Sequence, residues 1–354
     1  MYYNIHIHTF TEQDIPRRFL PLKLVRVLAS KTGFSVLANI LNNINPFSDK
    51  DMFDRYVIFI GIGKLGSQQK IFERCMQFYP ENNKFVVLAM DMAFMGAGKV
   101  PNPYEKQLEE LAALKRTYPQ IRPFIHIDPR RENAYDLLRK SMEEWGFNGI
   151  KIYPPLGYFP YDERLYPVYE YCTKHNLPVI AHSSPFNPVH YKGKKKEIIK
   201  LLEKSRTAVD TQKKNKKELC SYFTHPRNYQ YVLQDFKDLR ISFAHFGSSY
   251  FWEKYLDNPA EKDNWFRIIK NMMKKNPNLY ADISFTLYDK EFFSLLKVLL
   301  TDEKLKKQIL FGSDYYMVQT ETVERRFSLD LRAYLGEDIF NTVALHNPKA
   351  FLSE

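Results

Sequence analysis

The sequence has few cysteines and no hydrophobic run long enough to span a bilayer. Its three cysteines, Cys75, Cys172 and Cys220, stand far apart and form neither a disulfide framework nor a Cys-x-x-Cys metal site. We therefore expect a reduced, cytoplasmic protein with no membrane partner. We also expect no signal peptide, because the first strand-like run starts within a few residues of Met1 and contains two histidines.

Internal repeats and low-complexity linkers are also missing, and 354 residues suit one large α/β domain. Eight short runs, apolar as in strands buried on both faces, alternate with charged helical patterns, which predicts a parallel sheet with helical crossovers. The runs lie near residues 3–8, 85–91, 121–127, 149–153, 178–182, 240–245, 279–284 and 309–313. We predict a distorted TIM-type (β/α)8 barrel that forms a single domain over residues 1–354.

Two connections are unusually long, and we expect them as insertions on the rim of the barrel. They cover roughly residues 9–84, after barrel strand 1, and 185–239, after barrel strand 5. A ninth strand-like run at 56–61 falls in the first insertion, and we expect it as an extra strand or part of that insertion. It is followed by Gly-x-Gly-x-x-Gly at 61–66, the spacing of dinucleotide-binding domains, but this motif alone is weak.

Positive charge exceeds negative charge by 11, and much of the excess lies between Lys192 and Lys217. This stretch has few aromatic residues and no nucleic-acid motif, so we predict no nucleic-acid partner. A solvated, lysine-rich insertion explains the charge. Attraction of an anionic substrate or partner is the alternative.

Several of the predicted strands end in residues that bind metals. His6 and His8 share one face of the first strand, because alternate side chains point the same way. His182, His245 and Asp314 end three later strands. The carboxyl ends of barrel strands converge on one face, and imidazole and carboxylate groups suit zinc and similar divalent ions. The pattern therefore predicts a metal site on this face.

This ordered set resembles the metal-dependent amidohydrolase superfamily, in the amidohydrolase-related (amidohydrolase 2) branch. The resemblance spans nearly the whole chain except the insertions. Its motifs are His-x-His at 6–8, Gly-Ile-Lys-Ile-Tyr-Pro at 149–154, Pro-Val-Ile-Ala-His at 178–182, Ile-Ser-Phe-Ala-His-Phe-Gly at 241–247 and Phe-Gly-Ser-Asp at 311–314.

The resemblance implies that one divalent ion, most simply Zn²⁺, is held by His6, His8, His182 and Asp314. For His245 it leaves two roles open, a ligand of a second metal ion or a catalytic group. Lys151, at the end of the fourth strand, is either a carboxylated bridge between two ions or a structural or substrate-facing residue.

The implied activity is hydrolysis of an amide, ester or lactone bond in a small molecule by a metal-activated water. Asp314 would act as general base and then acid, and His245 would polarise the substrate carbonyl. One alternative on the same site is non-oxidative decarboxylation of an aromatic or enoic acid. Another is a catalytically inactive barrel that acts as a binding protein.

Three further residues are candidate substrate contacts because they follow predicted strand ends. Arg130 could bind a substrate carboxylate, and Tyr153 and Tyr315 could line the rim. Ordinary ion pairing and packing are the alternatives for each. His126, within the third strand, is expected to be structural. A homo-oligomer is compatible with the sequence, which predicts no interface.

Overall fold

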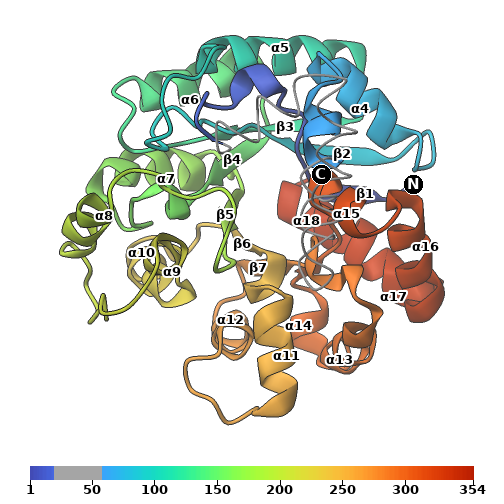
Figure 1. The fold of residues 1–354 in the computed structure, drawn as a ribbon. Coiled ribbons are helices and arrows are strands. Elements are labelled where there is room, and N and C mark those ends of the chain that lie inside the picture. Colours follow the sequence, from blue (N-terminus) through green and yellow to red (C-terminus); the bar gives the residue numbers. More distant parts are fainter. Residues whose placement is uncertain (20–57) are drawn as a thin grey trace, which may run out of the picture.

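The computed structural model describes residues 1–19 and 58–354. Eight parallel strands follow one another in chain order around a nearly closed barrel, with helices between them (Figure 1). The strands are β1 (Tyr3–Ile7), β2 (Lys84–Leu88), β3 (Ile121–His126), β4 (Gly149–Ile152), β5 (Val179–His182), β6 (Ile241–Ala244), β7 (Leu279–Asp282) and β8 (Ile309–Leu310). The predicted TIM-type barrel is confirmed.

Main-chain hydrogen bonds join the segment just after the last strand to the first strand. The amide of Ile5 donates to the carbonyl of Phe311 at 3.0 Å, and the amide of Asp314 donates to the carbonyl of His6 at 2.7 Å. The residues just after β8 therefore lie beside β1, so the two ends of the sheet meet where the candidate site begins.

The outer layer consists of helices that follow the strands. They are α4 (Gln68–Met76), α5 (Tyr104–Thr117), α6 (Ala134–Glu143), α7 (Tyr166–Lys174), α8 (Lys195–Leu202), α9 (Lys216–Ser221), α10 (Tyr229–Asp235), α11 (Ser249–Asp257), α12 (Trp265–Lys275), α13 (Phe293–Leu299), α14 (Glu303–Lys306), α15 (Tyr315–Glu321), α16 (Glu324–Leu335), α17 (Glu337–Asn341) and α18 (Asn347–Leu352). In the described ranges, no helix combines the length and apolar character needed to cross a bilayer.

Helix α12 shows how the sequence sets these elements. Its buried side chains recur with helical spacing, so they form one apolar face against the barrel. The side chain of Asn264 caps its first turn by accepting from the amide of Arg267 at 3.1 Å. Lys274 and Lys275 lie in the last turn, where positive charge complements the helix dipole.

A separate apolar cluster fills the barrel interior. It joins side chains from strands on opposite sides of the barrel, including Tyr3 and Ile5 of β1, Phe124 of β3 and Tyr280 of β7, which can meet only inside it. The β1–β2 pairing is irregular between Asn4 and Ile7. This irregularity lets Ile5 join the interior cluster while the next residue, His6, still faces the carboxyl end of the barrel.

The strand expected over 56–61 is wrong in its described part, because residues 58–63 are helical. A short apolar run fits either structure, and here it packs as a helix. The ring of Phe59 lies 5.2 Å from that of Tyr316 and 6.2 Å from that of Phe10. The Gly-x-Gly-x-x-Gly spacing therefore lacks the preceding strand that a dinucleotide-binding turn requires.

Candidate metal centre

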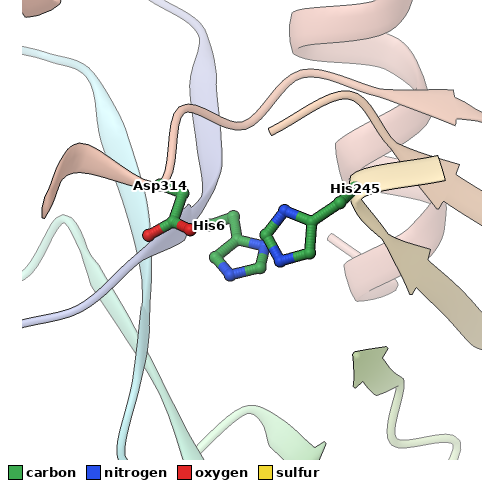
Figure 2. Close-up of side chains that lie close together, drawn as sticks. All are labelled: His6, His245 and Asp314. Atoms are coloured by element: carbon green, nitrogen blue, oxygen red, sulfur yellow. The ribbon is translucent and has the colours of Figure 1, made fainter. Parts of the chain in front are cut away.

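The predicted ligands come together at the carboxyl end of the barrel. His6 lies within β1, and His182 ends β5. His245 directly follows β6, and Asp314 lies just beyond β8. The ligand atoms of His6, His245 and Asp314 all lie within 4.8 Å of one another, and all three side chains are buried. Figure 2 shows these three side chains close together, although they come from distant parts of the chain.

His8 and His182 lie at the edge of this group. The ring of His8 is 5.4 Å from that of His6 between centroids. Nδ1 of His182 lies 3.2 Å from Nε2 of His245. The three residues that lie closest together thus include His245, whose role the resemblance left open. Two of the four expected ligands, His8 and His182, lie beside these three residues.

Hydrogen bonds define which nitrogen of three histidines faces the centre. Nδ1 of His8 lies 2.8 Å from the carbonyl oxygen of Leu88, and Nδ1 of His245 lies 3.0 Å from that of Ser284. A carbonyl oxygen only accepts, so each Nδ1 carries the proton and each Nε2 keeps a lone pair. Nδ1 of His6 is likewise 3.1 Å from a carboxylate oxygen of Asp282. These are the partners that orient metal-binding histidines.

Burial keeps these imidazoles neutral, which is the form that binds metals. It lowers the pKa of His8 to about 3 and the pKa of His245 to about 4. It also lowers the pKa of His6 and the pKa of His182 well below the ordinary value. All four rings are therefore neutral at neutral pH, each with one N–H and one nitrogen lone pair.

Asp314 and Lys151 are two buried ionisable groups whose charged forms are disfavoured by burial. Burial raises the pKa of Asp314 to about 7, although the nearby ammonium of Lys151 opposes the rise. Burial lowers the pKa of Lys151 to about 8, against the pull of Asp282 and Asp314. A cation among these groups would favour the ionised form of Asp314, since opposite charge stabilises a carboxylate.

A divalent metal fits this donor set. Nε2 of His6, Nε2 of His182 and Nζ of Lys151 are buried without a hydrogen-bond partner, although buried polar atoms are almost always paired. Neutral imidazoles and a carboxylate are zinc-type ligands. The two unpaired imidazole nitrogens therefore match a bound ion, and the unpaired Nζ leaves both expected roles of Lys151 open.

The backbone is strained where two of these residues are held. Asp314 has φ 58° and His245 has φ 65°, in the left-handed region that residues other than glycine rarely adopt. The hydroxyl of Thr286 donates to the carbonyl of His245 at 2.6 Å, and the amide of Gly247 donates to Ser183 at 3.1 Å. Strain of this kind, fixed by surrounding bonds, is common at functional sites.

A cavity of about 270 Å³ opens beside the centre, and its lining includes His8, His182, His245 and Asp314. Most of the other lining residues are apolar or aromatic.

The expected substrate contacts divide between the cavity and the surrounding structure. Tyr153 lines the cavity, whereas Tyr316 lines it in place of Tyr315. Arg130 does not line it and instead forms a two-point ion pair with Asp128, with Nε to Oδ1 at 2.8 Å. This pairing corresponds to the structural alternative for Arg130.

His126 also has a structural contact, as expected. Its Nδ1 accepts a hydrogen bond from the amide of Asp91 at 2.8 Å.

The sequence did not point to Asp282 and Ser284. Asp282 ends β7, and both residues are fully buried next to His6 and His245. A carboxylate in an apolar run is costly to bury without a partner. The sequence signal for Asp282 was therefore a carboxylate inside the apolar run at 279–284. Asp314 gives the same kind of signal at the end of the run at 309–313.

Residues 104–353 match the Amidohydro_2 family model, described as amidohydrolase. No curated protein matches the sequence.

Solved structures of similar fold include an uncharacterised TIM-barrel protein from Bordetella bronchiseptica. It is 16% identical, with a TM-score of 0.57 over 99% of this chain and 98% of that one. An amidohydrolase II is 10% identical, with a TM-score of 0.54 over 100% of both chains. The 4-oxalomesaconate hydratase of Rhodopseudomonas palustris is 14% identical, with a TM-score of 0.50 over 100% of this chain and 96% of that one. At these identities the similarity shows the fold alone.

Proposed function

The chain belongs to the amidohydrolase family, and from that premise we propose that it is a metal-dependent hydrolase of an amide, ester or lactone bond in a small molecule. Members of this family usually bind a divalent metal ion. The observation that carries the proposal is the buried group of His6, His245 and Asp314, whose ligand atoms lie within 4.8 Å of one another.

The proposed ion is most simply Zn²⁺, held by His6, His245 and Asp314 with His8 and His182 beside them. When bound, such an ion lowers the pKa of a water molecule and polarises a substrate oxygen. Nε2 of His245 has a lone pair rather than a proton, because its Nδ1 donates to Ser284. This tautomer favours the ligand role for His245 over donation to a substrate oxyanion.

Asp314 is the proposed proton carrier. Its carboxylate lines the cavity, so it can accept a proton from the attacking water and return it to the leaving group. The amide of Asp314 donates to the carbonyl of His6 at 2.7 Å, which fixes the carboxylate relative to the first ligand. The left-handed backbone at Asp314 keeps this side chain turned toward the cavity.

Elemental analysis of protein purified without chelator tests the metal. We expect about one equivalent of zinc or a similar ion per chain. A value near two would support Lys151 as a bridge, and protein with no measurable zinc affinity would favour the inactive binding protein.

The rate of turnover tests the role of Asp314, and the products that form test the reaction class. Asp314→Asn should lower turnover of a hydrolysed substrate by at least about 100-fold while the protein stays folded. Full activity in this variant would exclude the proposed role. Release of carbon dioxide from a carboxylate substrate, without a hydrolysis product, would favour the decarboxylase alternative.

A further inference from the structure

We infer that the substrate is an uncharged molecule with an apolar ring, and that Phe186 and Tyr250 bind this ring at the mouth of the cavity. The inference rests on the proposed function, because it concerns the cavity beside the candidate metal centre. It goes further by specifying the class of substrate and two residues that determine specificity.

The lining of the cavity supports an uncharged substrate. Apart from the residues of the metal centre, the described side chains that line the cavity are uncharged. Most are apolar or aromatic, such as Phe10, Met92 and Tyr316, and the others are polar but neutral. Among the described residues that line it, none is a lysine or an arginine. A buried substrate carboxylate needs charged or multiple hydrogen-bond partners. Away from the metal, the described lining offers such a group no cationic partner.

The excess positive charge of the chain does not change this conclusion. The exposed lysines of α8 and of the segment leading to α9 are absent from the lining. Ser184, Asn187 and Ser249 provide neutral hydrogen-bonding groups in the lining of the cavity. These groups suit an amide, ester or lactone, which is polar but uncharged.

Two aromatic side chains at the mouth form the proposed ring-binding site. Phe186, in the loop after β5, is 41% exposed, and Tyr250, at the start of α11, is 42% exposed. Both line the cavity, and their rings meet edge to face with centroids 5.3 Å apart. Large exposed aromatic surface is unfavourable in water and marks a binding surface when it borders a pocket.

The backbone holds Phe186 in this position against its conformational preference. Phe186 has φ 57°, and its amide donates to the hydroxyl of Ser221, in α9, at 3.0 Å. A strained residue that is locked by a hydrogen bond from another element is typical of a functional position. The lock gives Phe186 a fixed place at the mouth, so the ring is ready for a ligand to stack or pack against.

Binding of two matched probes tests the inference without requiring turnover. The probes are 2-acetylnaphthalene, which is neutral, and 2-naphthoate, which has the same ring system and a carboxylate. Their affinities for the purified full chain are measured by ligand-observed NMR, and the metal content of the same samples is determined. We expect the neutral probe to bind at least about tenfold more tightly.

Four variants locate the ring. Phe186→Ala and Tyr250→Ala should each weaken binding of the neutral probe by about five- to tenfold. Tyr250→Phe keeps the ring and should bind as the original protein does. Tyr135→Ala removes an aromatic side chain of similar exposure, 40%, on α6 away from the cavity and should also have no effect.

Equal or tighter binding of the carboxylate would overturn the inference, as would unchanged binding in both alanine variants. Melting temperatures of the variants establish that they are folded. A metal-free protein that still binds the neutral probe through Phe186 and Tyr250 would contradict the proposed hydrolase while supporting the ring site. The two failures are therefore distinguishable.

Discussion

At the level of single residues, Asp282 contacts two residues of the candidate metal centre, His6 and His245. One carboxylate oxygen lies 3.1 Å from Nδ1 of His6, and the other accepts from the amide of His245 at 3.0 Å. Asp282 thus orients a ligand ring and fixes the backbone that carries another. A carboxylate behind a metal-binding histidine has this effect in general.

We expect Asp282→Asn to weaken zinc binding about 10- to 100-fold, because the neutral amide no longer holds the Nδ1 proton of His6 by charge. Competition with a chromophoric chelator measures the affinity. Asp257→Asn is the matched control, since Asp257 is exposed at the end of α11. An unchanged zinc affinity in Asp282→Asn would show that Asp282 does not orient His6.

The residues at strand ends were predictable, whereas their partners were not. The apolar runs that end at His182, His245 and Asp314 imply a shared face, because parallel strands of a barrel end together. Which side chain reaches Nδ1 of His6 depends on the register of β7, and no local pattern specifies that register. The positions of Asp282 and Ser284 beside His6 therefore required the structure.

At the level of elements, Gly149 allows β4 to pack closely against its neighbours because it has no Cβ atom. A Cβ atom there would lie 2.5 Å from Cζ of Phe124 and 2.6 Å from the carbonyl oxygen of Pro178. The carbonyl belongs to the backbone and has little freedom to move. The glycine that precedes Lys151 in its motif thus has a packing function, because it lets the Phe124 ring fill the barrel interior.

Two glycine substitutions test this packing and the helix at 58–63. Gly149→Ala should lower the free energy of unfolding by about 1–3 kcal/mol, because the added methyl group overpacks the core.

Gly61→Ala should raise the free energy of unfolding by up to about 1 kcal/mol, because Gly61 is helical and exposed and a Cβ there meets nothing within 4 Å. Urea unfolding measures both values. Destabilisation by Gly61→Ala would contradict the helix.

The strands of the barrel were predictable because strands buried on both faces are continuous apolar runs. The same argument failed for the run at 56–61, whose described part belongs to a helix that packs through Phe59 against Phe10 and Tyr316. A short run does not distinguish these two environments. Its contacts with distant residues decide the structure.

At the scale of the whole molecule, the last residues of the chain close the amino end of the barrel. Phe351 belongs to the interior cluster, and Arg240 donates to the carbonyl of Ala350 at 2.8 Å. The Glu354 carboxylate accepts from Nζ of Lys84 at 2.6 Å and from the hydroxyl of Tyr3 at 2.7 Å, and it pairs with Arg122. Strands β1, β2, β3 and β6 are thus connected through one terminal segment.

This closure could not be predicted from the sequence, although the barrel itself could. Glu354 is an ordinary charged residue by pattern, and its three partners lie 232 to 351 positions away. The pairing of β1 with β2 and of β2 with β3 brings Tyr3, Lys84 and Arg122 together at one end, and the fold places Glu354 beside them. The ion pairs are a consequence of the topology.

Glu354→Gln should therefore weaken the fold in a way that depends on pH and leaves the metal centre unchanged. Although burial alone would raise the pKa of Glu354, the bonds from Arg122, Lys84 and Tyr3 lower it from 4.5 to about 2. A carboxyl group with a lowered pKa in the folded state stabilises that state above the unfolded pKa. This stabilisation is lost as the pH falls from about 4.5 toward about 2.

Because water screens this partly exposed group, we expect a loss of about 1 kcal/mol at pH 7 in the variant. Urea unfolding at pH 7 and at about pH 3 measures the difference between the two proteins, which should shrink by more than half at the lower pH. Zinc content should be equal in both, since Glu354 lies at the opposite end of the barrel from Asp314. A deficit that stays constant over this pH range would mean that Glu354 contributes by packing rather than by charge.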